Sequence, residues 1–257
     1  MKQVIVTVTL VGGFVIRAAW AANVQENCDY ARVTASKVYT SCIYTVTARD
    51  AKAVLSDQFA AFARCRHAYF KKWNGFQNPG RKPALAGSSC VGARFTDNGD
   101  LTVTDNLTGL VWEKKQDLDF TQQPANPHDA NNTYTWTTTT TAENGTAYTS
   151  FLASVNAGSG FGGANGWRLP TLAELETILL DFPCTGKGRG PDCHCPSAPC
   201  VDPMLDASNT IAAAFWTATT SLRFPEDAWL VFFDNGDALA PYGKGSASSV
   251  RAVRGGF

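Results

Sequence analysis

Cysteine is the residue of this chain with the clearest capacity for chemistry, and four cysteines share one loop. Cys193-His194-Cys195 lies between Cys184 and Cys200. Four thiolates at these spacings would suit a zinc ion. In an oxidising compartment they would form disulfides instead, and a ring across the single residue between Cys193 and Cys195 is strained. We therefore expect crossed disulfides with Cys184 and Cys200 and no metal.

Other motifs of catalysis or nucleotide binding are weak. Gly158-x-Gly160-x-x-Gly163 has the glycine spacing of a dinucleotide-binding loop, but no strand and helix flank it, so we expect a flexible loop. Lys187 follows a glycine without a Ser or Thr after it, and no Gly-x-Ser-x-Gly elbow is present. The histidines lie in three different regions: His67, His128 and His194. The sequence thus predicts no catalytic residue and no enzyme activity.

Oxygen-bearing side chains gather in two places, where calcium is the ion to consider. The first set surrounds the first expected hairpin: Asp97, Asn98, Asp100, Asp105 and Asn106. The second set occupies the next loop: Asp117, Asp119, His128, Asp129, Asn131 and Asn132. Asp and Asn are also the ordinary residues of turns. We expect turns and no cofactor, with calcium as the open alternative.

Residues 1–21 have the pattern of a secretory signal peptide. Lys2 gives a short basic start, an apolar run spans 4–16, and Ala19-Trp20-Ala21 fits the small-x-small site of signal peptidase. The alternative is a membrane anchor, but the run is shorter than the about 20 residues that a spanning helix needs. We expect cleavage after Ala21 or Ala22, no membrane span afterwards, and a periplasmic, secreted or cell-surface location.

The charge balance argues against nucleic acid as a partner. The chain has 22 basic and 22 acidic residues, so no overall electrostatic attraction to phosphates exists. Only 17% of the residues are charged, while Gly, Thr, Asn and Trp are plentiful. This composition favours short strands and loops over long solvated helices.

A small N-terminal module is expected over residues 23–76. Four apolar residues of its second half fall on one face of a helix: Leu55, Phe59, Phe62 and Tyr69. Its first half is ambiguous, because residues 38–47 are β-branched and aromatic while the spacing of Cys28 and Cys42 suits a helix. We choose a helical hairpin that turns near Arg49.

The eight cysteines indicate a disulfide framework, since their number is even and the chain is expected to be exported. Cys28 and Cys65 lie at similar distances from the expected turn, so we predict that they pair. Cys42 then pairs with Cys90 by elimination. Such cross-links would supply much of the stability of so small a module.

A linker rich in Gly, Pro and Asn, at 77–93, precedes the second part of the chain, at 94–257. This part reads mainly as short strands, which we expect at 94–95, 101–104, 110–112, 228–233 and 250–253. Asn98-Gly99 and Asp234-Asn235-Gly236 are turn signals. Thr171 and Glu174 form a capping box for one clear helix, a shorter helix is expected at 150–156, and 137–141 is a loop or edge strand.

Aromatic and polar residues near the last strands are candidates for ligand binding. We expect Trp112, Trp167 and Trp229 in the core, because they sit in strand-like patterns. Trp136 and Trp216 adjoin polar loops and could stack on a ligand. Further candidates occupy loops carried by the strands, where binding residues tend to lie: Arg223, Glu226, Asp234, Asn235, Asp237, Tyr242 and Lys244.

A series of motifs runs through the second part in a fixed order. They are Arg94-Phe-Thr-Asp-Asn-Gly-Asp100, Thr102-Val-Thr-Asp-Asn-Leu-Thr-Gly-Leu-Val-Trp-Glu-Lys-Lys115, Asn131-Asn-Thr-Tyr-Thr-Trp136, Gly166-Trp-Arg-Leu-Pro-Thr-Leu-Ala-Glu-Leu175, Phe215-Trp-Thr-Ala-Thr-Thr220, Ala228-Trp-Leu-Val-Phe-Phe-Asp-Asn-Gly236 and Val250-Arg-Ala-Val-Arg-Gly255. Over about residues 94–255 this order resembles the Lcl C-terminal domain family.

The resemblance implies an α+β fold of the C-type lectin type, related to the formylglycine-generating enzymes. Such a fold has a twisted antiparallel sheet, one or two helices and long loops, here preceded by the disulfide-linked helical hairpin. The named family member is a surface adhesin domain that binds sulfated glycans and forms a trimer. The resemblance therefore implies a glycan or a surface protein as partner, and a homo-oligomer.

This chain departs from the family in three places. Leu101 stands where the family usually has glycine. Cys193 and Cys195 look like an extra pair. The sugar motifs of calcium-dependent lectins are missing, since Gln123-Pro124 is followed by Ala125. Calcium-bridged sugar binding is therefore not implied.

The interpretation that follows is an exported, non-enzymatic, adhesin-like binding protein. One alternative is an enzyme of the formylglycine-generating type, which would need a reactive cysteine pair beside a cleft. Another is a receptor diversified by a retroelement within residues 215–251.

Overall fold

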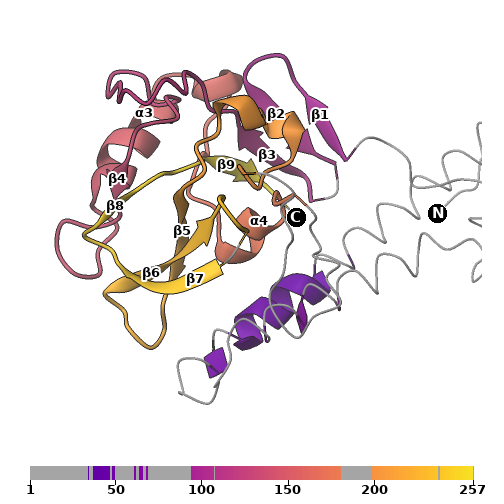
Figure 1. The fold of residues 1–257 in the computed structure, drawn as a ribbon, viewed down its shortest axis with the longest axis vertical. Coiled ribbons are helices and arrows are strands. Elements are labelled where there is room, and N and C mark those ends of the chain that lie inside the picture. The colour runs from indigo at the N-terminus through magenta and orange to yellow at the C-terminus, as the bar shows by residue number, and fades with distance from the viewer. Residues whose placement is uncertain are drawn as a thin grey trace, which may run out of the picture.

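The computed structural model of the protein describes residues 34, 37–46, 48–49, 61, 64–65, 68, 94–106, 108–180, 198–236 and 238–256. The expected signal peptide and linker lie outside these residues, as do Asp237 and five of the cysteines: Cys28, Cys90, Cys184, Cys193 and Cys195. The described part mixes helix and sheet, with short helices and antiparallel sheets (Figure 1). The helix-and-sheet class predicted from the sequence is confirmed.

The first sheet joins the beginning of this domain to its last strand. β1 (Phe95–Asp97), β2 (Thr102–Asp105) and β3 (Leu110–Glu113) form a meander, with ends within two residues of the predicted strands. β9 (Val253–Gly255) pairs antiparallel with β3. The last strand therefore begins later than the predicted 250–253, because the Ser249 and Ala252 carbonyls first accept hydrogen bonds from the Trp216 and Glu113 N–H groups.

Leu101 occupies the backbone conformation for which glycine is suited. Its φ is +66°, in the left-handed region, which is unfavourable for a residue with a Cβ. Side-chain hydrogen bonds hold the turn: Asp100 Oδ1 accepts from the Thr102 N–H at 3.1 Å and from its hydroxyl at 2.6 Å. The hairpin thus keeps its register although this chain lacks the glycine expected here.

Two further sheets complete the domain. β5 (Ala214–Thr220), β6 (Asp227–Phe232) and β7 (Ala238–Gly243) form one antiparallel sheet in that order. β4 (Tyr134–Thr135) pairs with β8 (Ala247–Ser248). Of these strands only β6 was predicted. The proline within β7 weakens its strand signal, and β7 is indeed an edge strand among the described residues.

The helices are short. α4 (Leu172–Glu176) begins at the predicted capping box, with Thr171 and Glu174 exchanging side-chain and backbone hydrogen bonds. The predicted shorter helix is a π-helical turn, η2 (Ala147–Leu152), continued by α3 (Ala153–Val155). The described residues also contain three single turns of 3-10 helix: η3 (Phe161–Gly163), η4 (Pro203–Leu205) and η5 (Ala207–Asn209).

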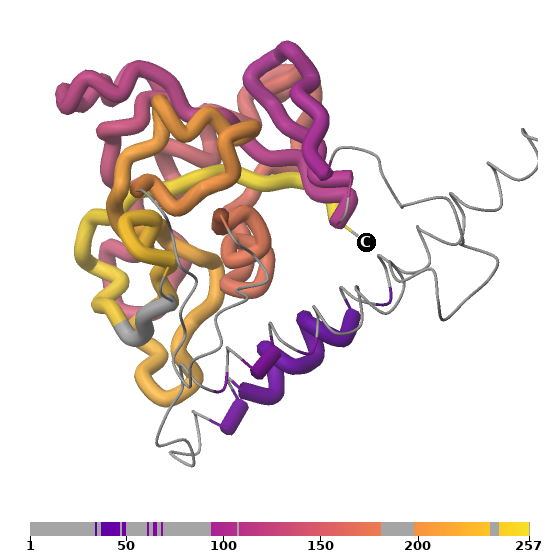
Figure 2. The backbone as a smooth tube through the Cα atoms, turned by 45° about the vertical axis from the view of Figure 1, so that its right-hand side comes forward, coloured from indigo at the N-terminus to yellow at the C-terminus, as the bar shows by residue number. Residues whose placement is uncertain are grey.

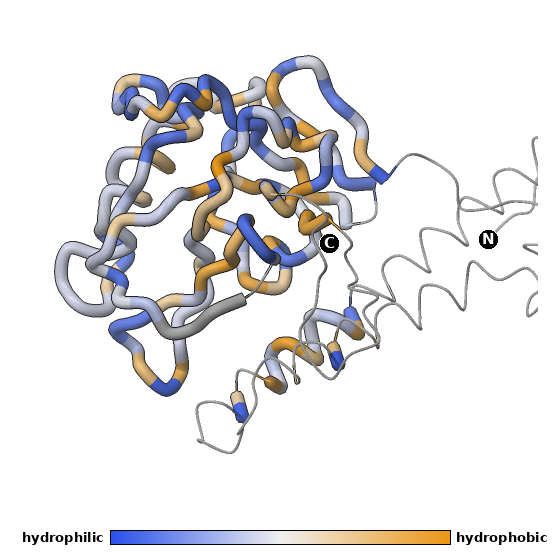
Figure 3. The backbone as a smooth tube through the Cα atoms, in the orientation of Figure 1, coloured by the Kyte–Doolittle hydropathy of each residue, from blue (hydrophilic) through white to orange (hydrophobic). Residues whose placement is uncertain are grey.

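The β5–β6–β7 sheet separates two hydrophobic clusters. Phe215, Trp229 and Val231 face the cluster that contains α4. Their neighbours Trp216 and Leu230 face the cluster beside β4 and η2. Figure 3 shows hydrophobic residues in the central strands and hydrophilic residues along many outer loops. Because both faces of the sheet are covered, β5 and β6 lack the apolar-polar alternation of a half-exposed strand.

The N-terminal segment is helical at 37–46 and packs against α4. The buried Tyr39 hydroxyl donates a hydrogen bond to the buried Glu176 carboxylate. The helical interpretation of these residues is therefore confirmed over the alternative of a strand. Among the described residues no helix is both long and apolar enough to cross a membrane.

The disulfide pairing predicted for this segment is wrong. Cys42 bonds to Cys65, with the two Cα atoms 5.4 Å apart, instead of Cys28 with Cys65 and Cys42 with Cys90. The expected turn near Arg49 misled the prediction, because residues 48 and 49 are still helical. Cys200 is also disulfide-bonded, and no described cysteine is free.

Candidate functional site

The residues that the sequence singled out for ligand binding do not form one site. β6 is six residues long, and the candidates divide between its two ends. At the end near the β5–β6 loop lie three of them: Arg223, Glu226 and Tyr242. At the other end lie two: Asp234 and Asn235. At about 3.3 Å per residue the ends are roughly 20 Å apart, so one small ligand cannot contact both.

The first end carries more exposed apolar surface, and we call it the hairpin-tip site. It consists of Leu222, Arg223, Phe224, Glu226 and Tyr242. Leu222 is 56% exposed, Tyr242 49% and Phe224 38%. The guanidinium carbon of Arg223 lies 5.0 Å from the centre of the Phe224 ring. One aromatic ring and a cation are thus presented together on this loop, and a second aromatic residue, Tyr242, lies on β7 at the same end of the sheet.

The buried side chain of Lys244 forms hydrogen bonds that hold this loop in place. Its Nζ donates to Thr220 Oγ1 at 2.9 Å and to the Pro225 carbonyl at 2.8 Å, and it lies 3.9 Å from the centre of the Trp136 ring. Its backbone N–H donates to the Glu226 carbonyl at 3.0 Å. The residue is 1% exposed, so the prediction that Lys244 itself contacts a ligand is wrong for this conformation. Lys244 therefore lies beneath the site and supports the loop through these hydrogen bonds.

Acidic groups surround this lysine. Burial lowers the pKa of Lys244, while the charges of Glu143, Asp227 and Glu226 oppose that effect. Burial raises the pKa of Asp227, and the neighbouring charge of Glu226 raises it further. No hydrogen bond or ion pair joins the Asp227 carboxylate to another described residue. The site therefore offers hydrogen-bond acceptors as well as aromatic rings.

Trp136 and Trp216 are core residues, contrary to the prediction that they stack on a ligand. They are 1% and 0% exposed. The Trp136 Nε1–H donates to the Thr217 carbonyl at 3.1 Å, and the Trp216 Nε1–H donates to the Tyr134 carbonyl at 2.9 Å. The two rings thus tie β4 and its continuation to β5. Trp112, Trp167 and Trp229 are buried as predicted.

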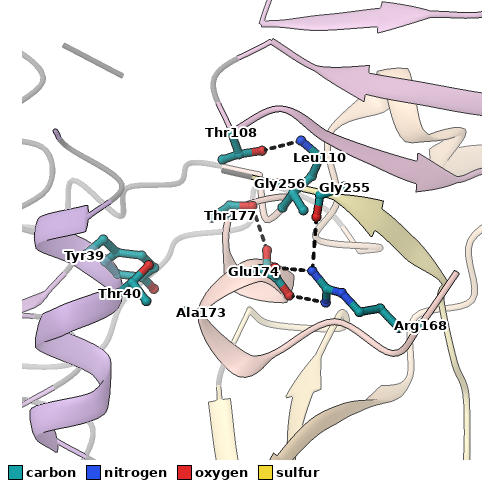
Figure 4. A pocket seen from close by; sticks show the side chains of 10 residues that line it. All are labelled: Tyr39, Thr40, Thr108, Leu110, Arg168, Ala173, Glu174, Thr177, Gly255 and Gly256. Carbon is teal, nitrogen blue, oxygen red and sulfur yellow. Dashed lines mark hydrogen bonds and ion pairs between the residues drawn. The ribbon is translucent and has the colours of Figure 1, made fainter. Parts of the chain in front are cut away.

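A pocket lies between the helical segment 37–46 and the domain (Figure 4). Its volume is about 190 Å³. Arg168 at its edge is held by Glu174 through two hydrogen bonds of 2.8 and 2.7 Å, and it also donates to the Gly255 carbonyl. The Arg168 pKa is raised mainly by that hydrogen bonding to Glu174. The two charged groups that line the pocket, Arg168 and Glu174, are therefore paired with each other. Neither is available as a catalytic acid or base.

A buried ionic cluster lies at the end of β3. Glu113 Oε1 contacts Lys115 Nζ and His128 Nδ1, both at 2.9 Å, and Glu113 Oε2 accepts from the Ala252 N–H at 2.8 Å. Arg251 donates to the Glu113 carbonyl. Burial opposes the charge of Glu113, but Lys115 and the hydrogen bonds outweigh it and lower the pKa. These groups brace β3 against the segment before β9.

The oxygen-rich loop after β3 is organised around an amide group. Asn131 Nδ2 donates to the Asp117 carbonyl at 2.8 Å, to Asp119 Oδ1 at 3.0 Å and to the Thr121 carbonyl at 3.2 Å. A bound cation would need the position that this nitrogen takes. Among the described residues no group of three or more His, Cys, Asp and Glu side chains is arranged to hold a metal.

Sequence reasoning missed several of the exposed apolar residues. Leu222 and Phe224 were not predicted, because charged residues and tryptophans are the more usual signals of a binding loop. Phe120 escaped because it lies in an acidic loop, yet it is 83% exposed. A lone aromatic residue between turn-forming residues was the signal that could have identified it.

The described chain thus defines a mixed helix-and-sheet domain whose buried polar residues brace its loops. Residues 101–254 match the family model of the Lcl C-terminal domain, and the chain belongs to that family. The resemblance drawn from the order of motifs is confirmed. Comparisons with curated proteins and with solved structures gave no match to this chain.

Proposed function

We propose that the chain is an exported, non-enzymatic, adhesin-like protein that binds a surface glycan through the hairpin-tip site. The observation that carries the proposal is the loop 221–226, held by Lys244, which presents Phe224 and Arg223 to solvent at the same end of the sheet as the exposed Tyr242. A rigid loop loses little entropy on binding. Family membership and a fold of the C-type lectin type, which we include in the proposal, agree with a binding role.

The size of the site favours a sugar over a protein. A stable protein interface takes about 800 Å² from each partner and roughly 20–30 residues. The hairpin-tip site has five residues, and its two aromatic rings and the Glu226 carboxylate match the apolar faces and hydroxyl groups of a sugar. A surface protein remains the other outcome of the test.

The experiment is binding of the purified protein to glycan and surface-protein arrays. We expect glycan binding, and Tyr242→Ala and Phe224→Ala should each weaken it about tenfold or more, as loss of an aromatic contact does. Phe120→Ala serves as control, since it removes an exposed ring elsewhere. Binding to proteins alone, or glycan binding unchanged in both tip variants, would refute the proposal.

The enzymatic alternative is tested separately. A formylglycine-generating mechanism needs a reactive thiol, and the described cysteines are all in disulfides. Intact mass of the native and reduced protein, with thiol labelling, counts the thiols. A native mass eight hydrogens below the reduced mass agrees with the binding proposal, whereas a labelled thiol supports the enzyme.

A further inference from the structure

The pocket between the helical segment 37–46 and α4 has a lining of mixed character. The two elements lie side by side (Figure 2), and β3 and β9 contribute further lining residues. Tyr39, Leu110 and Ala173 are buried and give the pocket apolar walls. Three threonines and one ion pair also line it (Figure 4). Apolar walls with a few polar groups are the usual lining of a binding site for a small molecule.

The size of the pocket limits what can fill it. Its volume is about 190 Å³. An apolar cavity of roughly 150 Å³ admits benzene, so this pocket has room for one six-membered ring with small substituents. Gly256 leaves the wall uncrowded, because a Cβ there would lie 3.0 Å from Cδ2 of Leu110, another lining residue. The pocket therefore fits a single ring and not a chain of rings.

The threonines of the pocket suit a ligand that carries hydroxyl groups. Thr108 Oγ1 accepts a hydrogen bond from the Leu110 N–H at 3.3 Å, which leaves its hydroxyl hydrogen for an acceptor on a ligand. The Thr177 hydroxyl donates to the Glu174 carbonyl at 2.6 Å, so its oxygen can accept from a donor on a ligand. A hydroxyl group is both a donor and an acceptor, and it therefore matches both threonines.

The charge of the pocket favours a neutral ligand. Arg168 donates two hydrogen bonds to Glu174, and it also donates to the Leu169 and Gly255 carbonyls. The guanidinium and the carboxylate thus compensate each other within the protein. A charged ligand would lose its water of hydration without meeting an unpaired opposite charge on the described lining residues, and this loss costs free energy.

We propose that this pocket is a binding site for one neutral sugar ring, such as an uncharged hexose. The less polar face of the ring packs against Tyr39, Leu110 and Ala173, while its hydroxyl groups bind Thr108 and Thr177. A phenol would fill the same space, but it has a single hydroxyl group for the two threonines. No residue of the hairpin-tip site lines the pocket, so this proposal does not rest on the function proposed for that site.

Amide NMR of the purified full chain, titrated with the methyl glycosides of glucose, galactose and mannose, tests this. We expect at least one of these sugars to shift the amide signals of Leu110, Ala173 and Gly256. Shifts confined to Phe224 and Tyr242 would place the sugar at the hairpin-tip site and overturn the proposal for the pocket. Absence of any shift, or shifts caused by phenol alone, would also overturn it.

Two tryptophan variants separate the pocket from the rest of the helical segment. Thr40→Trp should abolish the shifts, because Thr40 is exposed and lines the pocket. Thr45→Trp is the matched control, since Thr45 is exposed on the same segment but is not a lining residue, and the shifts should persist. Thermal unfolding verifies that both variants are folded. Equal binding by the wild type and Thr40→Trp would refute the assignment.

The polar lining is tested by one further variant and by the charge of the sugar. Thr108→Val keeps the shape of the side chain and should weaken binding roughly 2- to 10-fold, the range for loss of one hydrogen bond. The corresponding uronic acid and amino sugar should each bind at least about tenfold more weakly than the neutral hexose. Tighter binding of either charged sugar would contradict a neutral ligand.

Discussion

The ammonium group of Lys244 lies 3.9 Å from the centre of the Trp136 ring, in a position closed to solvent. This contact links the end of β7 to the residue that follows β4, while the same nitrogen holds Thr220 and Pro225. A buried lysine placed over an aromatic ring is uncommon and is stabilised by its cation-π contact. The shape of the hairpin-tip site therefore depends on a residue that no ligand touches.

Replacing Lys244 tests whether this residue stabilises the loop. Lys244→Met keeps the length of the side chain but leaves the Pro225 carbonyl without its donor. We expect destabilisation by about 1–3 kcal/mol, because the hydrogen bonds from the buried ammonium group to Thr220 and Pro225 are both lost. Urea unfolding measures the free energy. Lys114→Met is the control, since its ion pair with Asp97 is partly exposed and should contribute less than about 1 kcal/mol.

Glu113 should make the domain sensitive to acid. Because its pKa in the folded state lies below the ordinary value of 4.5, the unfolded chain binds the proton first as the pH falls. The stabilisation is complete above about pH 4.5 and is lost as the pH falls through the folded pKa. Denaturant unfolding at several pH values should follow this course.

The variant Glu113→Gln should flatten that dependence. It also leaves Lys115 buried without its carboxylate, so we expect a loss of about 3–5 kcal/mol at neutral pH. Glu143→Gln, at an exposed position, is the matched control. If the two variants show equal stability at neutral pH, the buried cluster does not act as described.

The hydrogen bond from Tyr39 to Glu176 should fasten the helical segment to α4. Tyr39→Phe removes the donor and leaves a buried carboxylate less satisfied, which should weaken the attachment by about 1–3 kcal/mol. Hydrogen exchange of residues 37–46 measures it. Tyr44→Phe, on the exposed side of the same helix, should change exchange much less. Equal exchange in the two variants would mean that the hydroxyl contributes nothing to the attachment.

The Cys42–Cys65 disulfide should stabilise the N-terminal segment. The cysteines are 23 residues apart, and closing a loop of this length stabilises by about 3 kcal/mol in the chain-entropy model. The double variant Cys42→Ser, Cys65→Ser should expose residues near 37–46 to protease while the domain at 94–256 resists. Equal resistance of both parts would show that packing alone holds the segment.

Local signals predicted part of this fold correctly. The capping box at Thr171 and Glu174 and the turn at Asn98-Gly99 identify α4 and the first hairpin, because such hydrogen bonds involve only near neighbours. The direction of Trp136 and Trp216 was not predictable in this way. Whether such a side chain is buried depends on which faces of the sheet are covered by other elements. In this domain both faces of the β5–β6–β7 sheet are covered.

The candidate site was predicted less well, for a related reason. Lys244 was expected at the surface, since lysine is rarely buried without an acidic partner. Only the assembled structure brings Trp136, Thr220 and Pro225 together around its ammonium group. Likewise the pairing of Cys42 with Cys65 depends on where a helix ends, which is the least certain feature of a helix in sequence.

The pairing of β9 with β3 has a consequence for the order in which the molecule forms. β3 at residues 110–113 receives its second neighbour only when residues 253–255 arrive, about 140 positions later. Until then the Trp112 ring and the buried carboxylate of Glu113, both on β3, are not fully enclosed. A chain still emerging from a ribosome or a translocation channel therefore cannot finish this sheet. Completion of the first sheet therefore depends on the arrival of residues 253–255.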